Sequence, residues 1–394
     1  MEQKDDERAI KRVAIAAAVV AMLIAVYARY VNPVRPGQTT PGGFYSFDDQ
    51  SFYLAMARTL ARLHLPDRRT YKYGFGYPAF GAFFFRIGFH GDPFAPVDVL
   101  SFGATIGLTV VLGARAAYGF ARDYAFGLGV AAGLLLTTPA LLPVATVPWN
   151  TNIVLPLGLV ILVAVTSRKP ISNVAAATIG LSVGWIFASR YIDALFFGVP
   201  ILASFAVRSN QERRRLMLLG GSITAAIVTL VLLSQYRVFG NPFTTPYHTH
   251  LRQGFGNDQS VSNYQLRWIP SHFWGTFVRG KPSLPLIPSD PIFRQLPLLP
   301  LAPIGAVLLI RKASSRTRWI WLTAIVASSV SALFYLSFVA GGADDLKFGS
   351  QRYWAVWYPL WSVLSLLALS ALVTEAARGF GRWTRRSAPQ QQHM

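Results

Sequence analysis

Two adjacent carboxylates, Asp48 and Asp49, are the residues of this chain whose types and spacing best suit chemistry. They stand directly before a segment whose apolar side chains follow helical spacing, namely Phe52, Met56, Leu60 and Leu63. A carboxylate at a helix start can accept hydrogen bonds from unpaired backbone N–H groups. A neighbouring acid or partial burial raises a carboxylate pKa and suits it to act as a general base. A helix cap and a catalytic base therefore both remain open for this pair, on an amphipathic helix expected to lie at a membrane surface.

Four basic residues could stabilise negative charge that grows on a leaving group. Arg190 lies between two apolar stretches and Arg352 at the start of a late one, with Lys347 and Lys72 as further candidates. An arginine inside a membrane segment is costly and is a functional candidate by default. The alternatives are that Arg190 reaches the headgroups or pairs with Asp193, and that Arg352 anchors the end of a span.

Aromatic and amide side chains lie close to the predicted ends of the apolar segments. Candidates for contact with a ligand are Asn150, Trp149, Tyr77 and Tyr353. Rings can stack on a ligand, although an aromatic belt at the membrane interface explains them equally well.

Metal binding has two weak signals and is not predicted. His248 and His250 would point the same way on an extended segment, and Asp258 could be a third ligand for zinc or manganese. Paired histidines in a loop are more often incidental. A divalent ion on Asp48 and Asp49 is the other option, and no cofactor is firmly predicted.

The composition is that of a polytopic membrane protein. Of the 394 residues 53% are hydrophobic and 14% charged, and the mean hydropathy is +0.38. The net charge of +20 is better explained by basic loops on one side of a membrane and by anionic lipid or phosphate than by nucleic acid. The absence of cysteine excludes disulfides and thiol nucleophiles. The sequence lacks the common motifs for ATP, dinucleotides, zinc proteases and serine hydrolases.

Ten apolar segments are expected to span the membrane within a single membrane domain, 1–394. They lie at about 13–30, 97–117, 123–140, 150–167, 173–190, 191–207, 215–236, 296–310, 319–340 and 353–375. The first could instead be a signal peptide, since Val26-Tyr27-Ala28 resembles a cleavage site. A shorter apolar stretch, 79–89, is predicted to be a second interfacial or re-entrant helix, after the one that follows Asp48 and Asp49, and is too short to cross the membrane.

Basic residues predict the orientation of these segments. With the N-terminus in the cytoplasm, every short turn on the inner side is basic, near 115–122, 168–169, 208–215, 311–318 and 378–386. Both termini, including a basic tail at 376–394, are then cytoplasmic. The long segments 31–96, 237–295 and 341–352 lie outside, where free nucleotide sugars are scarce.

Several motifs in order along the chain resemble those of the GT-C superfamily of membrane glycosyltransferases. These are Phe47-Asp48-Asp49 with Tyr53–Arg58, Gly76-Tyr77-Pro78, Leu112–Gly119, Leu136–Pro139, Ala188–Tyr191, Gly240–Phe243 and Gln351-Arg352-Tyr353 with Pro359. The superfamily includes protein O-mannosyltransferases, lipid A aminoarabinose transferases and actinobacterial arabinosyltransferases. Some members carry an acid at the outer start of the fourth span, where this chain has Asn150, which can bind sugar hydroxyls but cannot be a base.

The resemblance implies an all-α bundle of about ten transmembrane helices with juxtamembrane helices in the first outer loop. It also implies inverting transfer of a sugar from a polyprenyl-phosphate donor to a hydroxyl of a glycan, lipid or protein, on the outer face of the plasma membrane. Asp48, slightly ahead of Asp49, would be the base, and arginines would hold the phosphate. The sugar or the acceptor would be bound by Asn150, Trp149, Tyr77 and Tyr353. A transporter or flippase of lipid-linked or anionic solutes is the alternative.

Overall fold

The computed structural model describes residues 2–31, 48–71, 73–118, 122–137, 141–142, 148–244, 265–279, 291–337 and 354–387. All regular secondary structure in these ranges is helical, which confirms the predicted all-α class.

Ten helical segments coincide with the ten predicted apolar segments. They are α1 (Glu2–Val31), α4 (Ala95–Ala117), α5 (Arg122–Thr137), α7 (Thr151–Val165), α8 (Asn173–Ser189), α9 (Tyr191–Val207), the continuous α10–η2–α11 (Asn210–Arg215, Leu216–Gly220, Gly221–Phe239), α15 (Ala302–Lys312), α16 (Ser315–Leu336) and α18 (Tyr358–Ser387). Among the described residues five of these helices are long and apolar enough to cross a membrane, and four more are apolar but shorter. The segment predicted at 296–310 is divided between a short turn, η6 (Leu299–Leu301), and the 11-residue α15.

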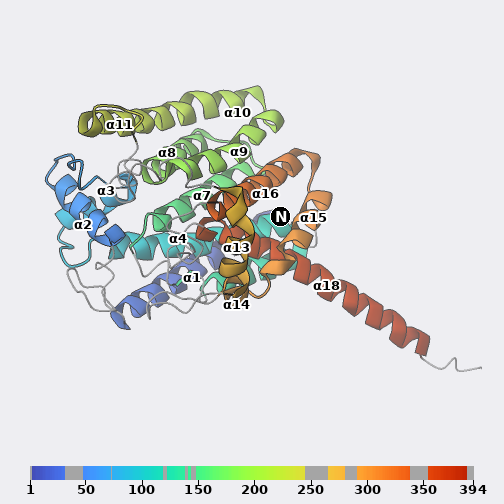
Figure 1. Ribbon diagram of the computed structural model, residues 1–394. Helices are drawn as coiled ribbons and strands as arrows, with labels where there is room; N and C mark the ends of the chain where they lie inside the picture. Colours follow the sequence, from blue (N-terminus) through green and yellow to red (C-terminus); the bar gives the residue numbers. More distant parts are fainter. Residues whose placement is uncertain are drawn as a thin grey trace, which may run out of the picture.

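The long helices pack side by side into one bundle (Figure 1). Helix α4 lies at its centre and contacts α1, α5 and α7, while α8 contacts α7 and α11, and α15 contacts α18. Close approach depends on glycine at two crossings. A Cβ on Gly180 would overlap the Gly220 carbonyl, and one on Gly305 would overlap the Leu364 carbonyl. Small residues at helix crossings are the usual solution in membrane bundles, where backbones must approach closely.

Two short helices that are not predicted to cross the membrane pack together at one end of the bundle, at the left in Figure 1. They are α2 (Asp48–Ala61) and α3 (Gly76–Arg86). Both were predicted, although α3 begins three residues before position 79. The predicted apolar face of α2, formed by Phe52, Met56, Leu60 and Leu63, is only partly correct. The residues that turn into the protein are Gln50, Tyr53, Leu54, Met56 and Ala57, whereas Phe52 and Leu60 are half-buried and Leu63 is exposed.

The physical reason is that the partners of α2 are aromatic rings instead of aliphatic side chains. Tyr53 lies 5.0 Å from Tyr73 and 5.3 Å from Tyr77, measured between ring centroids. Leu63 lies beyond the helix end, at a left-handed φ of 62° that L-residues rarely adopt. The sequence periodicity therefore located the helix but only part of the face that the protein covers.

The remaining short helical turns lie between α11 and α18 along the chain. They are η4 (Leu266–Trp268), α13 (Ile269–Phe273), η5 (Trp274–Arg279), α14 (Ile292–Gln295) and η7 (Ala355–Trp357). The loop after α2 is fastened to the end of α11, because Arg68 donates from Nε to the Val238 carbonyl at 2.8 Å and the Tyr71 hydroxyl lies 3.2 Å from that of Ser234. Burial raises the pKa of Tyr71 to about 12, so this hydroxyl stays protonated.

Candidate active site

The backbone of Asp48 and Asp49 forms the first turn of α2. Their side chains are outside what the structure describes. The next residue, Gln50, is buried and donates from Nε2 to the Pro148 carbonyl at 3.3 Å. The acidic turn is thereby placed beside the residues that lead into α7.

A buried ionic network fastens α1, α3, α4 and α7 together at this end. Asp98 of α4 is completely buried and forms an ion pair with Arg29 of α1. Its Oδ1 atom accepts hydrogen bonds of 2.8 Å from the Tyr77 hydroxyl and of 2.8 Å from Asn152 Nδ2. Arg29 also contacts Asp92 at 2.5 Å. The carboxylate of Asp98 is thus paired and hydrogen-bonded, as a buried charge requires.

A second buried network surrounds Arg190, which occupies the extended residue between α8 and α9. Its Nε lies 2.8 Å from Asp193 Oδ2, and its Nη2 donates to the Tyr335 hydroxyl at 2.7 Å. That hydroxyl in turn donates to Asp193 Oδ1 at 2.8 Å, and Arg190 Nη1 donates to Thr151 Oγ1 at 3.1 Å. The pairing with Asp193, one of the alternatives considered from sequence, is therefore present.

The start of α7 joins the two networks through consecutive residues. Asn150 donates from Nδ2 to the Ser189 carbonyl at 3.3 Å, Thr151 accepts from Arg190, and Asn152 donates to Asp98. The described side chains of this region form one continuous polar cluster beneath the acidic turn of α2.

The structure brings together some of the predicted site residues and leaves others outside its description. Tyr77, Trp149, Asn150 and Arg190 all lie in this cluster and are buried. Tyr77 and Asn150 hold neighbouring elements in place here, and their sugar-binding role stays a prediction. Beyond the described residues lie Lys72, Lys347, Arg352, Tyr353, His248, His250 and Asp258. In the ranges that are described, His, Asp and Glu form no group of three able to hold a metal ion.

Sequence reasoning missed Arg29, Asp98, Asn152 and Tyr335 as members of the site. A signal for the first two was present, because each is an ionisable residue at the same predicted end of an apolar segment. Such residues in membrane segments usually pair with one another. Asn152 and Tyr335 carried no comparable signal, since their role depends on which helices become neighbours.

Known structures place this arrangement in a fold class. No protein-family model matches the sequence, and no curated protein matches it by sequence. The chain has the GT-C fold of polytopic membrane glycosyltransferases, as the ordered motifs predicted.

The structure of this chain is similar to that of ArnT from Cupriavidus metallidurans. The structure of ArnT bound to undecaprenyl phosphate matches with a TM-score of 0.58 and 16% identity, over 91% of this chain and 59% of that one. ArnT in the apo state matches with a TM-score of 0.55 and 14% identity, over 90% and 59% of the two chains. The chain thus covers less than two thirds of ArnT. The archaeal oligosaccharyltransferase AglB from Archaeoglobus fulgidus, in complex with an inhibitory peptide and a dolichol-phosphate, matches more weakly, with a TM-score of 0.47 and 14% identity over 97% and 52%.

Proposed function

We propose that this protein transfers a sugar from a polyprenyl-phosphate donor to a hydroxyl acceptor at the end of the bundle that carries α2 and α3. The fold it shares with ArnT, whose structure was determined with undecaprenyl phosphate, supports the choice of donor. The acceptor is a glycan, a lipid or a protein. We further propose that this end faces the outside of the plasma membrane and that both termini are cytoplasmic, following the distribution of basic residues.

One chain of contacts carries the proposal, because it connects the acidic turn to a buried arginine. Gln50, which follows Asp49, binds the Pro148 carbonyl, and Asn150 binds the carbonyl of Ser189, the residue before Arg190. Two hydrogen bonds at the start of α7 therefore connect the helix that carries the proposed base to the residue before the proposed phosphate-binding cation. Sugar transfer needs these two functions on either side of the anomeric carbon.

In the proposed reaction the acceptor oxygen attacks the anomeric carbon as the bond from that carbon to the phosphate oxygen breaks. The acceptor proton passes to Asp48 or Asp49, and the bonding electrons leave with the lipid phosphate. The phosphate needs no general acid, since it is already a good leaving group. A single displacement of this kind inverts the anomeric configuration.

Arg190 is proposed to stabilise the departing phosphate together with Arg352, with Lys347 and Lys72 as further cations. Its ion pair with Asp193 and its hydrogen bond to Tyr335 fix the plane of the guanidinium group. A fixed plane favours two parallel hydrogen bonds to phosphate oxygens. As a partner of Arg190, a bound phosphate would displace the neutral hydroxyl of Thr151 more readily than the carboxylate of Asp193.

The test is transfer by purified full-length protein from a panel of polyprenyl-phosphate sugars to membrane extracts, with products identified by mass spectrometry. We expect Asp48→Asn or Asp49→Asn to abolish product while the protein remains folded. Asp67→Asn is the matched control, because Asp67 lies in the same predicted outer loop and hydrogen-bonds to Thr70 locally. Full activity in both the Asp48 and Asp49 variants would refute the proposed base. Solute flux without any covalent product would favour a transporter.

A further inference from the structure

A second polar site lies at the opposite end of the bundle, away from α2 and α3. It is a cavity of about 860 Å³ between the start of α1, the end of α4, the start of α5, the turn after α7 and the junction of α15 with α16. We call it the basic-end pocket. Arg115 on its wall is 17 residues along α4 from Asp98, which corresponds to roughly 25 Å of helix. It is therefore separate from the candidate active site.

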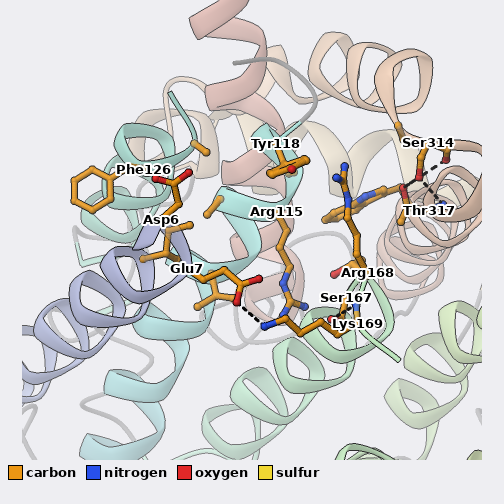
Figure 2. A pocket seen from close by; sticks show the side chains of 18 of the residues that line it. Asp6, Glu7, Arg115, Tyr118, Phe126, Ser167, Arg168, Lys169, Ser314 and Thr317 are labelled. Carbon is orange, nitrogen blue, oxygen red and sulfur yellow. Dashed lines mark hydrogen bonds and ion pairs between the residues drawn. The ribbon is translucent and has the colours of Figure 1, made fainter. Parts of the chain in front are cut away.

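The charge of the basic-end pocket is strongly positive. Its lining includes two carboxylates, Asp6 and Glu7, and five basic residues, which are Lys11, Arg115, Arg168, Lys169 and Lys312. Glu7 is already engaged by Lys169 at 2.5 Å. Figure 2 shows Arg115 and Arg168 between the acids on one side and Ser314 and Thr317 on the other. Both arginines therefore line the pocket from different walls, where an anion could approach either of them.

Arg115 gives the most direct indication that the pocket can take a further anion besides Glu7, whose charge already interacts with this guanidinium group. Its Nη1 atom is shielded from solvent and makes no hydrogen bond within the described part of the chain. A buried donor without an acceptor costs about 1–3 kcal/mol and more for a charged group. The general preference for basic residues on one side of a membrane explains surface charge. It does not explain a guanidinium nitrogen that is shielded from water.

The turn that carries Arg168 and Lys169 is held rigidly by Arg208. This buried side chain donates to the carbonyls of Val165, Ser167 and Lys169 at 2.9, 2.6 and 2.9 Å. It also pairs with Glu212 at 3.0 Å. Arg168 itself lies over the ring of Tyr118, 3.8 Å from its centroid. Pre-organised cations of this kind lose little entropy when an anion binds.

The remaining wall of the pocket is apolar, which indicates an amphiphilic ligand. It is formed mainly by Ile10, Ala125, Phe126, Leu309 and Trp321. The first turn of α16, capped by Ser314, also faces the pocket and adds the positive end of a helix dipole. Cations, a helix start and an apolar wall together suit a phosphate group attached to a hydrocarbon chain.

We propose that the basic-end pocket binds a lipid with a phosphomonoester headgroup, whose phosphate contacts Arg115 and Arg168 and whose chain lies against the apolar wall. This inference does not rest on the proposed sugar transfer. The same anion chemistry could be satisfied by free phosphate, and the experiment below separates these two sources.

The chain has no cysteine, so one introduced thiol gives a local reporter. Phe126→Cys on the pocket rim, labelled with an environment-sensitive fluorophore, would be titrated with short-chain phosphatidic acid in full-length protein. Phosphatidylcholine of the same chain length is the neutral lipid, and inorganic phosphate is the free anion. Val174→Cys, exposed at the start of α8, is the control label. We expect phosphatidic acid to change the signal at position 126 and not at position 174, with phosphatidylcholine inactive.

Charge variants in the labelled protein then test the contacts. We expect Arg115→Gln or Arg168→Gln to raise the apparent Kd for phosphatidic acid about tenfold or more, because each removes a charge-assisted contact. Arg168 is exposed, so its variant keeps the fold even if that of Arg115 does not. Arg311→Gln, which removes an equal charge from the end of α15 outside the pocket lining, should change Kd less than twofold. Equal weakening by Arg311→Gln, or no phosphatidic acid signal at position 126, would overturn the proposal. Saturation by inorganic phosphate at the same Kd would assign the site to a soluble anion instead of a lipid.

Discussion

Asn152 Nδ2 donates a 2.8 Å hydrogen bond to Asp98 Oδ1, and this bond ties the start of α7 to the start of α4. Both side chains are buried. The same α7 turn contacts Arg190 through Thr151, so the bond lies between the two ionic networks of the candidate site. Because Asp98 accepts this bond, the side chain at position 152 must supply a hydrogen-bond donor.

Replacing this donor by an acceptor should destabilise the protein more than removing it. In Asn152→Leu the carboxylate keeps Arg29 and Tyr77, and we expect a loss of about 1–3 kcal/mol for the missing partner. In Asn152→Asp a second carboxylate faces Asp98 in a buried site, which is repulsive as well as unpaired. Thermal unfolding of the detergent-solubilised protein should therefore rank wild type above Asn152→Leu and Asn152→Asp lowest. Wild-type stability for Asn152→Asp would show that the bond is absent in solution.

The Arg29–Asp98 ion pair should show strong coupling in a double-mutant cycle. Removing Arg29 leaves the buried Asp98 with neutral hydrogen-bond partners only, which costs about 3–5 kcal/mol, whereas Arg29 without Asp98 keeps its pairing with Asp92 and should lose less. Removing both with Arg29→Met and Asp98→Leu leaves apolar groups of similar size, and we expect the double variant to be more stable than Arg29→Met alone. Chemical unfolding of the four proteins measures the coupling energy. Additive losses would mean that the two residues do not share an ion pair.

These contacts mark the limit of what the sequence could predict. The apolar segments located the long helices because hydropathy is a property of each segment by itself. Asp48 and Asp49 were correctly placed at a helix start because their position follows from the local helical spacing. Which face of α2 is buried depended on Tyr73 and Tyr77, which are distant in sequence. The Arg190–Asp193 pair was foreseeable from its three-residue spacing, whereas Tyr335 joins it from a helix more than a hundred residues later.

The hydrogen bonds of Tyr335 separate a structural role from a role in the proposed transfer. Tyr335→Phe removes one hydroxyl that accepts from Arg190 and donates to Asp193, without changing charge. If Arg190 holds the donor phosphate, a less constrained guanidinium should lower kcat more than it changes the KM for the acceptor. We expect a loss of about tenfold in kcat, equivalent to about 1.4 kcal/mol of transition-state stabilisation. Steady-state kinetics with the donor and acceptor varied separately make this measurement.

The matched control for that variant is Tyr358→Phe, which removes a buried hydroxyl that makes no hydrogen bond within the described residues. It should leave both kcat and stability close to those of the wild type. An equal loss of activity in the two variants would assign the effect of Tyr335→Phe to general packing.

His272 should make stability depend on pH through the contact between α13 and the end of α16. Burial lowers the pKa of His272 below its usual value of 6.5, and its Nδ1 lies 2.8 Å from the Leu336 carbonyl. Because the folded pKa is depressed, acid protonates the unfolded state first. Above about pH 6.5 the imidazole is neutral in both the folded and the unfolded state, so its titration does not affect the free energy of unfolding. The free energy of unfolding then decreases as the pH drops from 6.5 toward the pKa of the folded state. His272→Gln keeps a donor for the carbonyl but does not titrate, so its Tm should fall less than that of the wild type between pH 7.5 and pH 5. Parallel Tm curves for the two proteins over this range would show that His272 is not the titrating group.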